Sequence, residues 1–428
     1  MRGARTRNYD AIVVGGGIVG CATAYYSARA GLRVLVVEAS NIAAQQSGRN
    51  LGFVRQQGRD FRELELMIHA ARLWPQLEAE LGRDIGWRQG GNLALATDES
   101  DRERLARWAR RAADYGLDTQ MVSREKAMAL APKLAAPFVG AMYTASDGKA
   151  EPARTTCAFY DAARALGAEA VIGAHVDEIV MSGGGVAGVR IGGKLFHSDR
   201  VVCAAGAGTG KLLRKAGLVF PQSTVRATVV RTEAVPFDIA PCVSGRVAGI
   251  RQAVDGTLHL SVAGGDYDLG TSVFSDFRWF RHALRESHGA VTLNYLHAFK
   301  RLLPDRSPAA VPDLATGKAD PRPSPAKAKA ALDEFDSLFP ALAKRRVVGS
   351  WAGLIESTPD MIPAIGSVSG IIGLLVASGF SGHGFGPGPM VGKILADLLC
   401  GKAEPAYLSH LSPDRFARAV WSPQPVMS

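Results

Sequence analysis

The clearest hydrophobic pattern along the chain is a pair of short apolar runs on either side of a helical segment. Residues 11–14 (AIVV) and 33–37 (RVLVV) are rich in β-branched residues, as is typical of strands buried in a parallel sheet. The helical pattern between them runs to Ala30, and Gly31 can end that helix. The sequence therefore predicts a β-α-β unit over residues 9–38.

The rest of the chain alternates between helical and β-type patterns. Its predicted helices cover residues 61–81, 98–117, 123–130, the stretch after a turn at 147–152 up to Leu166, and 390–399. Its predicted strands cover residues 92–96, 171–179, 201–205, 224–233, 257–262 and 374–377. Pro75 should kink or divide the first of these helices, and residues 183–185 should form a hairpin turn.

Three glycines follow the first buried strand with the spacing G-x-G-x-x-G. Gly15 permits a tight turn, Gly17 lets a pyrophosphate approach the backbone, and Gly20 lets the helix pack closely on the strand. The helix N-terminus offers free N–H groups to phosphates. Glu38 ends the second strand, where its carboxylate can accept hydrogen bonds from ribose hydroxyls and would repel a 2′-phosphate. The pattern predicts a site for FAD or NAD rather than NADP; the alternative is a glycine-rich turn in an ordinary β-α-β unit.

A second glycine-rich loop lies near the end of the chain. Residues 378–388 hold five glycines and stand between the strand predicted at 374–377 and the helix predicted at 390–399. Glycine lets a loop approach a flat ligand closely, and the helix start offers backbone N–H donors. This strand, loop and helix form a second candidate ligand-binding unit.

Composition excludes several classes of protein. The chain has 428 residues, enough for two or three domains, and its 50 Lys plus Arg against 40 Asp plus Glu give a net charge of +10. The arginines are scattered, so no basic block suggests a nucleic-acid tail. Five cysteines without a C-x-x-C pair argue against a disulfide framework or a zinc site and fit a reducing compartment, and we expect a cytoplasmic protein.

Two segments raise the question of a membrane. The N-terminal MRGARTR followed by an apolar run mimics a signal peptide, but that run carries the motif glycines, which cleavage would remove. Residues 276–303 are rich in arginine and aromatic residues, most densely at 277–285, and are expected to cover a sheet as an amphipathic segment. The alternative is contact with a membrane surface or a partner subunit. The Pro- and Ala-rich residues 307–326 are expected to form a surface loop.

Motifs spread over nearly the whole chain resemble, in the same order, those of the D-amino acid oxidase superfamily of flavoproteins. They are the first glycine motif, SGRNLG at 47–52, DGKAEP at 147–152, VCAAGAG at 202–208, WAGLIESTPDMIPAIG at 351–366 and GFSGHGF at 379–385. The resemblance implies a mixed α/β and α+β fold class. A Rossmann-like FAD-binding domain (residues 1–84, 147–220 and 345–428) would be interleaved with a substrate-binding domain on a mostly antiparallel sheet (85–146 and 221–344).

The resemblance also implies a set of FAD-binding residues. The first glycine motif would hold the pyrophosphate, Glu38 and Ala39 the adenosine ribose, and the later loops the flavin. The full set is Gly15, Gly17, Ile18, Val19, Gly20, Glu38, Ala39, Gln46, Ser47, Arg49, Leu51, Gly52, Val176, Ala205, Gly206, Gly353, Ile355, Gly379, Phe380, Ser381, Gly382, His383, Gly384 and Phe385.

The chain departs from the family pattern where relatives hold the substrate. Glycine oxidase-like members bind the substrate carboxylate with an arginine at the position of Ile355, and sarcosine oxidase-like members with a lysine at that of Gly386. A desolvated carboxylate still needs a cation, and Arg55 is the first candidate. The next candidates are Arg226 and Arg251. Alternatively, the substrate is bulky or differently charged.

Three further positions bear on the flavin chemistry. Some relatives attach the flavin to a cysteine at the position of Gly353, so the resemblance implies non-covalent FAD. His259 stands where sarcosine oxidase-like members use a lysine to promote the reaction with oxygen, which would favour a dehydrogenase. His383 lies in the loop expected at the flavin and is a candidate catalytic residue.

The resulting hypothesis is an FAD-dependent oxidoreductase for the C–N bond of a D-amino acid, an N-alkyl amino acid or a cyclic imino acid. Hydride transfer to flavin N5 would give an imine that hydrolyses to a 2-oxo acid, with O2 or a quinone or other electron-transfer partner as acceptor. The alternatives are the flavin subunit of a multi-component dehydrogenase and a non-catalytic FAD-binding protein.

Overall fold

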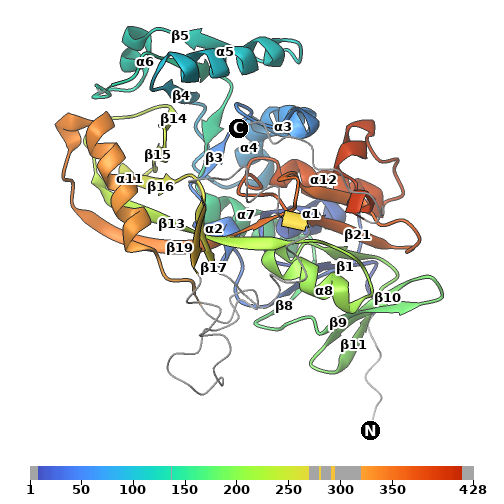
Figure 1. Cartoon of the computed structure of the whole chain (residues 1–428). Helices are drawn as coiled ribbons and strands as arrows, with labels where there is room; N and C mark the ends of the chain where they lie inside the picture. The colour runs from blue at the N-terminus through green and yellow to red at the C-terminus, as the bar shows by residue number, and fades with distance from the viewer. Residues whose placement is uncertain (1–7, 136, 269–278, 281–290, 295–319, 417–428) are drawn as a thin grey trace.

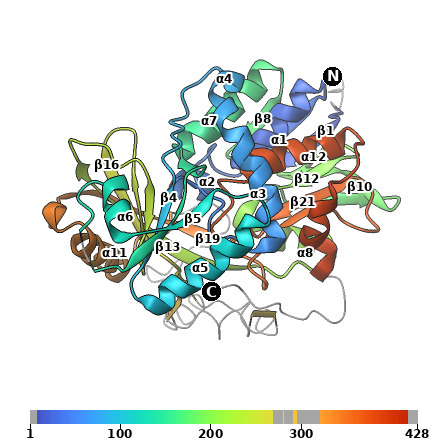
Figure 2. The same cartoon turned by 90° about the horizontal axis from the view of Figure 1, so that it is seen from above.

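Two large β-sheets organise the molecule, which we describe from a computed structural model (Figure 1). The structure describes residues 8–135, 137–268, 279–280, 291–294 and 320–416. Viewed from above, the two sheets form neighbouring halves, with α11 (Pro325–Leu338) at the outer end of one half and α12 (Gly388–Leu399) in the other (Figure 2).

The first sheet has six strands among the described residues and is parallel except at one edge. Its order is β20-β21-β12-β1-β2-β8, and only β20 runs antiparallel to its neighbour. The strands are β1 (Ala11–Val14), β2 (Val34–Glu38), β8 (Glu169–Ile172), β12 (Val201–Cys203), β20 (Ala364–Ser367) and β21 (Leu374–Ser378). β1 is wholly buried at the centre, as its β-branched apolar sequence predicts.

Two helices from opposite ends of the chain pack together beside this sheet. α1 (Ile18–Arg29) contacts both α12 and α7 (Pro152–Ala165). The contact with α12 requires a glycine, because a Cβ at Gly392 would lie 2.4 Å from the Cβ of Ala22. The N-terminal β-α-β unit and the C-terminal strand, loop and helix unit are therefore one structural body.

The second sheet has ten strands among the described residues and is mostly antiparallel. Its order is β18-β17-β13-β16-β15-β14-β4-β6-β5, and β19 pairs with β13 beside that path. The strands are β4 (Asn92–Ala96), β5 (Thr119–Val122), β6 (Gly140–Thr144), β13 (Ser223–Ala234), β14 (Cys242–Ser244), β15 (Ala248–Gln252), β16 (Thr257–Val262), β17 (Gly265–Asp268), β18 (Val291–Asn294) and β19 (Val347–Ser357). Helix α11 packs on β13, β15 and β16, and α5 (Glu99–Ala113) packs on β4, β5 and β6.

Shorter elements connect the sheets and cover their edges. The elements nearest the site are α2 (Gln46–Arg49), α3 (Phe61–Leu73) and the paired strands β3 (Phe53–Val54) and β7 (Gly148–Lys149). The others are η1 (Trp74–Gln76), α4 (Leu77–Leu81), α6 (Arg124–Leu130), β9 (Glu178–Ser182), β10 (Gly185–Ile191), β11 (Lys194–His197), η2 (Gly206–Gly208), α8 (Thr209–Lys215), η4 (Pro340–Leu342), η5 (Ala406–Leu411) and η6 (Pro413–Phe416).

The observed elements confirm the predicted fold class, with one mostly parallel and one mostly antiparallel sheet. Pro75 divides the helix over residues 61–81 into α3, η1 and α4, as predicted. A single strand over residues 171–179 is wrong: β8 ends at Ile172, and Gly173, at φ +75°, turns the chain so that Ala174 N donates to Glu38 O. The sequence also did not predict β19.

Several expectations concern residues that the structure does not describe. Most of 276–303 and of 307–326 lie outside the described residues, and α11 begins at Pro325, within the expected loop. The expected domain division placed residues 347–357 with the cofactor domain, but by hydrogen bonding β19 is a strand of the ten-stranded sheet. Among the described residues, no helix is long and apolar enough to cross a membrane.

Candidate active site

One large cavity opens between the two sheets, with a volume of about 1070 Å³. Small-molecule sites usually measure about 300–1,000 Å³, so this cavity has room for a large ligand. Residues 15–17 of the first glycine motif and residues 382–385 of the C-terminal loop both line it. Two segments more than 360 residues apart thus share one cavity, as the resemblance implied.

The first glycine motif has the backbone shape that its sequence predicts. Gly15 is at φ +115°, and a Cβ there would lie 2.2 Å from the carbonyl oxygen of Ala204. A Cβ at Gly20 would lie 1.9 Å from the carbonyl oxygen of Gly15, so this residue serves the packing of α1 on β1 and does not line the cavity. The first turn of α1 holds no acidic residue, which leaves its N-terminus suited to an anion.

Glu38 lies at the carboxyl end of β2, on the cavity wall beside Ala39 and Val176. Its two carboxylate oxygens accept hydrogen bonds from Gly16 N at 2.6 Å and Ser40 N at 2.7 Å. The carboxylate is therefore fixed at the rim of the glycine turn, where a ribose would be recognised.

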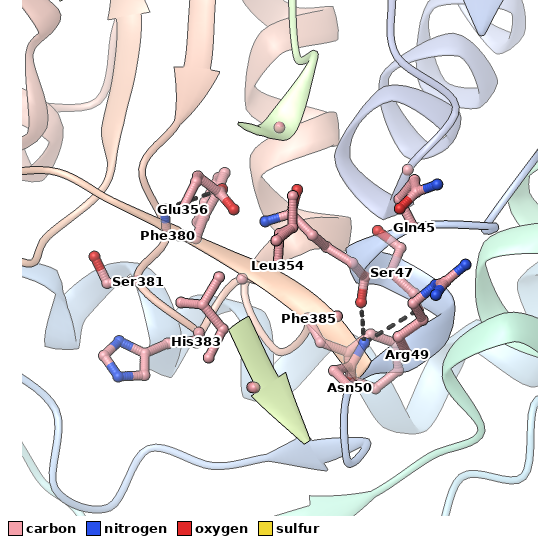
Figure 3. Close-up of a pocket in the computed structure, with 18 of the residues that line it drawn as sticks. Gln45, Ser47, Arg49, Asn50, Leu354, Glu356, Phe380, Ser381, His383 and Phe385 are labelled. Atoms are coloured by element: carbon pink, nitrogen blue, oxygen red, sulfur yellow. Dashed lines mark hydrogen bonds between the residues drawn. The ribbon is translucent and has the colours of Figure 1, made fainter. Parts of the chain in front are cut away.

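The segment around α2 forms the next part of the wall (Figure 3). The side chain of Asn50 folds this segment, because its Nδ2 donates to the carbonyls of Gln46 and Ser47, each at 3.1 Å. Ser47 Oγ accepts from Ile18 N at 2.8 Å and so joins α2 to the start of α1. Arg49 Nη1 donates to Ala352 O at 3.0 Å and joins α2 to β19.

The C-terminal loop is held against the end of β19. Ser381 N donates to the carbonyl of Glu356 at 2.9 Å, and Phe380 N lies 3.4 Å from its Oε1 (Figure 3). Trp74 Nε1 donates to Gly386 O at 2.7 Å on the other side of the loop. The side chain of Glu356 is 5% exposed, and burial raises its pKa to about 7.

Arg55 follows β3 and lines the cavity at its other end. Its Nη1 donates to the carbonyl of Gln57 at 2.5 Å, and no carboxylate of the described chain lies within 4 Å of its guanidinium. Burial, and then the charge of the neighbouring Arg59, lower the pKa of Arg55 from its ordinary value. Asp147, with a pKa that burial raises to about 6, accepts from the backbone N–H of Gln56 at 2.7 Å and fixes this segment.

The other candidate anchors lie elsewhere. Arg251 is 1% exposed and makes two hydrogen bonds to the carboxylate of Glu151, at 2.9 and 3.2 Å. Arg226 pairs with Asp266 at 3.3 Å. Neither arginine is among the described residues that line the cavity, so neither is placed to hold a substrate there.

His259 is also away from the cavity wall formed by the described residues. Its Nδ1 lies 3.2 Å from Arg251 Nη2, and its ring stands edge-to-face to Trp351 with centroids 5.3 Å apart. Burial, and then Arg251, lower the pKa of His259 to about 4. Among the described residues, the structure therefore places His259 in a partly buried contact with Arg251 and Trp351 and not on the cavity wall.

His383 does line the cavity, and its side chain is 33% exposed. Burial of the ring and the charges of Arg59 and Arg55 lower the pKa of His383 well below its ordinary value. Gly379 lies behind the loop, where a Cβ would meet Thr358 at 2.3 Å. The remaining members of the predicted cofactor set, other than Gly20 and Gly379, line the cavity.

Sequence reasoning missed several residues at this site. Asn50 and Glu356, which lie within recognised motifs, were not singled out, and neither were Arg59 and Glu63. The i, i+4 spacing of Arg59 and Glu63 at the start of a predicted helix was the available signal for one pair. Nothing in the sequence indicated the partner of Glu356, because that partner lies on the C-terminal loop.

The fold and the cavity are those of a dinucleotide-binding protein, with the cavity between a mostly parallel sheet and a mostly antiparallel one. A model of the FAD-dependent oxidoreductase family matches residues 10–398, and the chain belongs to that family. Mouse mitochondrial dimethylglycine dehydrogenase is 24% identical over 96% of this chain and 44% of its own length. The chain thus spans less than half of that relative.

Two further relatives match along nearly their whole length. The sarcosine oxidase subunit beta of Arthrobacter sp. is 25% identical over 96% of this chain and 91% of its own length. The structure of L-amino acid deaminase from Proteus myxofaciens, solved in complex with anthranilate, superposes with a TM-score of 0.86 at 22% identity. It covers 97% of this chain and 95% of the deaminase, a likeness of fold.

FAD is the cofactor of this family, and the residues of the cavity fit it. The glycine turn leaves room for a pyrophosphate above an α1 N-terminus free of acidic residues. Glu38 is fixed beside the glycine turn, where it could bind a ribose, and the α2 segment and the C-terminal loop line other parts of the cavity. Gly353 offers no thiol at the wall, in keeping with non-covalent binding.

Proposed function

We propose that the protein is an FAD-dependent oxidoreductase that oxidises the C–N bond of an amino acid or a related amine that bears a carboxylate. The substrate would be a D-amino acid, an N-alkyl amino acid or a cyclic imino acid, and the imine product would hydrolyse to a 2-oxo acid. The names of the two curated relatives, which specify dimethylglycine and sarcosine, favour an amine next to a carboxylate.

The observation that carries this proposal is the state of Arg55. Three other arginines line the cavity, and each already has a carboxylate within 4 Å: Arg49 with Asp320, Arg59 with Glu63, and Arg104 with Asp101. Arg55 has no such partner in the described part of the chain, although it is partly buried and lies near a second cation, Arg59. A guanidinium in that position is stabilised by an incoming carboxylate, to which it can donate two parallel hydrogen bonds.

The mechanism assigns the chain's residues to binding and orientation. FAD supplies, when bound, the acceptor for the hydride that leaves the carbon beside the substrate nitrogen. Arg55 would hold the carboxylate and so fix that carbon relative to the C-terminal loop. Apolar side chains of the wall, such as Leu51, Phe53 and Val262, would cover the rest of the substrate and exclude water.

Substitution of Arg55 combined with removal of the substrate carboxylate tests this assignment. The flavin of the purified holoenzyme is reduced anaerobically with a panel of D-, L-, N-methyl and cyclic amino acids, and then with the decarboxylated amine of each active compound. Arg55→Ala should raise KM for the amino acid about 100-fold while changing that for the decarboxylated amine little. Arg104→Ala, at a cavity arginine already paired with Asp101, is the matched control and should leave both values near wild type.

Two results would contradict the proposal. An equal effect of Arg55→Ala on both compounds would show that the arginine does not recognise the carboxylate. A holoenzyme that no amine in the panel reduces would favour the alternative of a non-catalytic FAD-binding protein.

A second candidate function is the flavin subunit of a multi-component dehydrogenase. The name of the Arthrobacter relative, a subunit beta, favours it, because that relative matches along 91% of its length. Analytical ultracentrifugation of the protein purified at native abundance separates the two candidates: an assembly with other chains supports the subunit. Peroxide release during turnover by the isolated chain supports a self-sufficient oxidase.

A further inference from the structure

A buried polar cluster joins the start of α3 to the C-terminal loop beside the cavity. The side chains of Arg59 and Glu63 are 2% and 3% exposed, and Arg59 Nη1 lies 3.4 Å from Glu63 Oε1. Arg59 Nη2 donates to the carbonyl of His383 at 3.0 Å, and its Nε donates to the carbonyl of Arg55 at 3.1 Å. Arg59 therefore fixes the carboxylate of Glu63 relative to both the loop and the Arg55 segment.

His383 contributes a buried ring nitrogen to this cluster that lacks a hydrogen bond in the described part of the chain. Its Nδ1 is buried and has no hydrogen-bond partner within the described chain, and Glu63 Oε1 lies 3.7 Å away. That distance is about 0.5 Å too long for a hydrogen bond, and a buried polar nitrogen without a partner is costly. A small rotation of the imidazole would close the gap to an acceptor that is already in place.

The opposite edge of the ring is the part that the cavity can reach. His383 is 33% exposed and lines the cavity although its Nδ1 is buried. In Figure 3 the imidazole extends from the loop on the side away from Ser47 and Asn50. Arg59 donates to the carbonyls of both Arg55 and His383, so the two residues lie on either side of one guanidinium.

We propose that Glu63 is a positioning residue that accepts a hydrogen bond from Nδ1–H of His383 and so leaves Nε2 as an acceptor facing the cavity. A carboxylate on one ring nitrogen sets the tautomer and orientation of an imidazole. The free Nε2 accepts a hydrogen bond from the amine N–H of the substrate while Arg55 binds the carboxylate. This second statement rests on the proposed function, whereas the tautomer does not.

The tautomer can be observed directly in the FAD-loaded protein labelled with ¹⁵N-histidine. The His383 signals are assigned by their loss in His383→Gln, and long-range ¹H–¹⁵N correlation spectra show which nitrogen carries the proton. We expect Nδ1–H in the wild type and a shift toward Nε2–H in Glu63→Gln. Glu65→Gln is the matched control, because Glu65 lies on the same helix with an exposed side chain.

Wild-type His383 protonated on Nε2, or a tautomer unchanged in Glu63→Gln, would overturn the inference. The wild-type spectrum decides the question by itself if Glu63→Gln fails to fold.

The kinetic arm separates this inference from the proposed function. Glu63→Gln should slow anaerobic flavin reduction at saturating amino acid about tenfold, with the FAD content and the KM near wild type. Glu65→Gln should not slow it. A wild-type flavin that no amine reduces would contradict the proposed function and leave the tautomer result standing. If the wild type is active and Glu63→Gln reduces its flavin at the same rate, His383 has no role at the substrate amine.

Discussion

The cavity has two walls of different kinds, one shaped by glycine backbone and one formed by side chains. Beside the six-stranded sheet lies a backbone wall, whose shape depends on glycines whose missing Cβ atoms leave room for carbonyl groups, as at Gly15. On the other side, charged and apolar side chains such as Arg55 and Val262 form the wall. The backbone wall fits the cofactor that the family shares, and we expect the side-chain wall to differ with the substrate.

The largest effect is expected from a substitution that breaks the backbone wall. Gly15→Ala should lower the free energy of unfolding by about 4 kcal/mol and abolish FAD binding, because the new Cβ would lie 2.2 Å from Ala204 O at φ +115°. Gly31→Ala is the control: it has φ +90° but nothing within 4 Å of the Cβ, and should cost only about 1–2 kcal/mol. Denaturant unfolding and flavin fluorescence titration measure both quantities.

Equal losses for the two variants would show that the strained dihedral angle alone matters at Gly15. The contact between the new Cβ and Ala204 O, just after β12, would then add nothing to the loss of stability. The glycine turn would accept a Cβ as well as an ordinary turn does.

The sequence predicted the backbone wall well, because a glycine motif depends only on the local strand, turn and helix. The need for a residue without a Cβ at these positions does not depend on the rest of the fold. Gly15, Gly17 and the second glycine loop were found in this way. It predicted the side-chain wall poorly. The register of β15 and β16 pairs Arg251 with His259. This pairing, which the sequence does not show, brings the two side chains together and places Arg251 against Glu151.

The same limit applies to the cluster of Arg59, Glu63 and His383. His383 lies more than 300 residues from Arg59 and Glu63, and no local pattern relates helix α3 to the C-terminal loop. Their proximity follows from the packing of α3 against α12, which the sequence did not specify.

Glu356 lies where the two walls meet and gives a pH-dependent test. Its folded pKa of about 7 is above the ordinary 4.5, so the folded state favours the protonated form. The contribution of protonated Glu356 to the free energy of unfolding is complete below about pH 4.5. It is lost as the pH rises through about 7, which lowers the free energy of unfolding by up to about 3 kcal/mol. Glu356→Gln should therefore match the wild type near pH 4.5 and be more stable by about 1–3 kcal/mol at pH 8.

Thermal and denaturant unfolding from pH 4.5 to pH 8 check this difference. Glu65→Gln, at an exposed position, should leave the pH dependence unchanged. Parallel curves for Glu356→Gln and the wild type would show that the carboxylate is ionised at little cost, and that the side chain is less isolated from water than the structure indicates.

The smallest effect should come from removing helix caps. Comparing the caps of α3 and α5 tests whether the position of α3 matters for the site. Asp60 caps α3 by accepting from Arg62 N at 2.9 Å, and Asp98 caps α5 by accepting from Asp101 N at 2.9 Å. Each change to Ala should lower the free energy of unfolding by about 1 kcal/mol. Glu63 lies on α3, next to His383 of the C-terminal loop. A small displacement of α3 would move Glu63 relative to His383, so only Asp60→Ala should also slow flavin reduction, by about two- to threefold. Rapid-mixing kinetics on both variants measure the rate. If both caps slowed it equally, general loosening of the fold would explain the effect, and the position of α3 would have no particular role in the site.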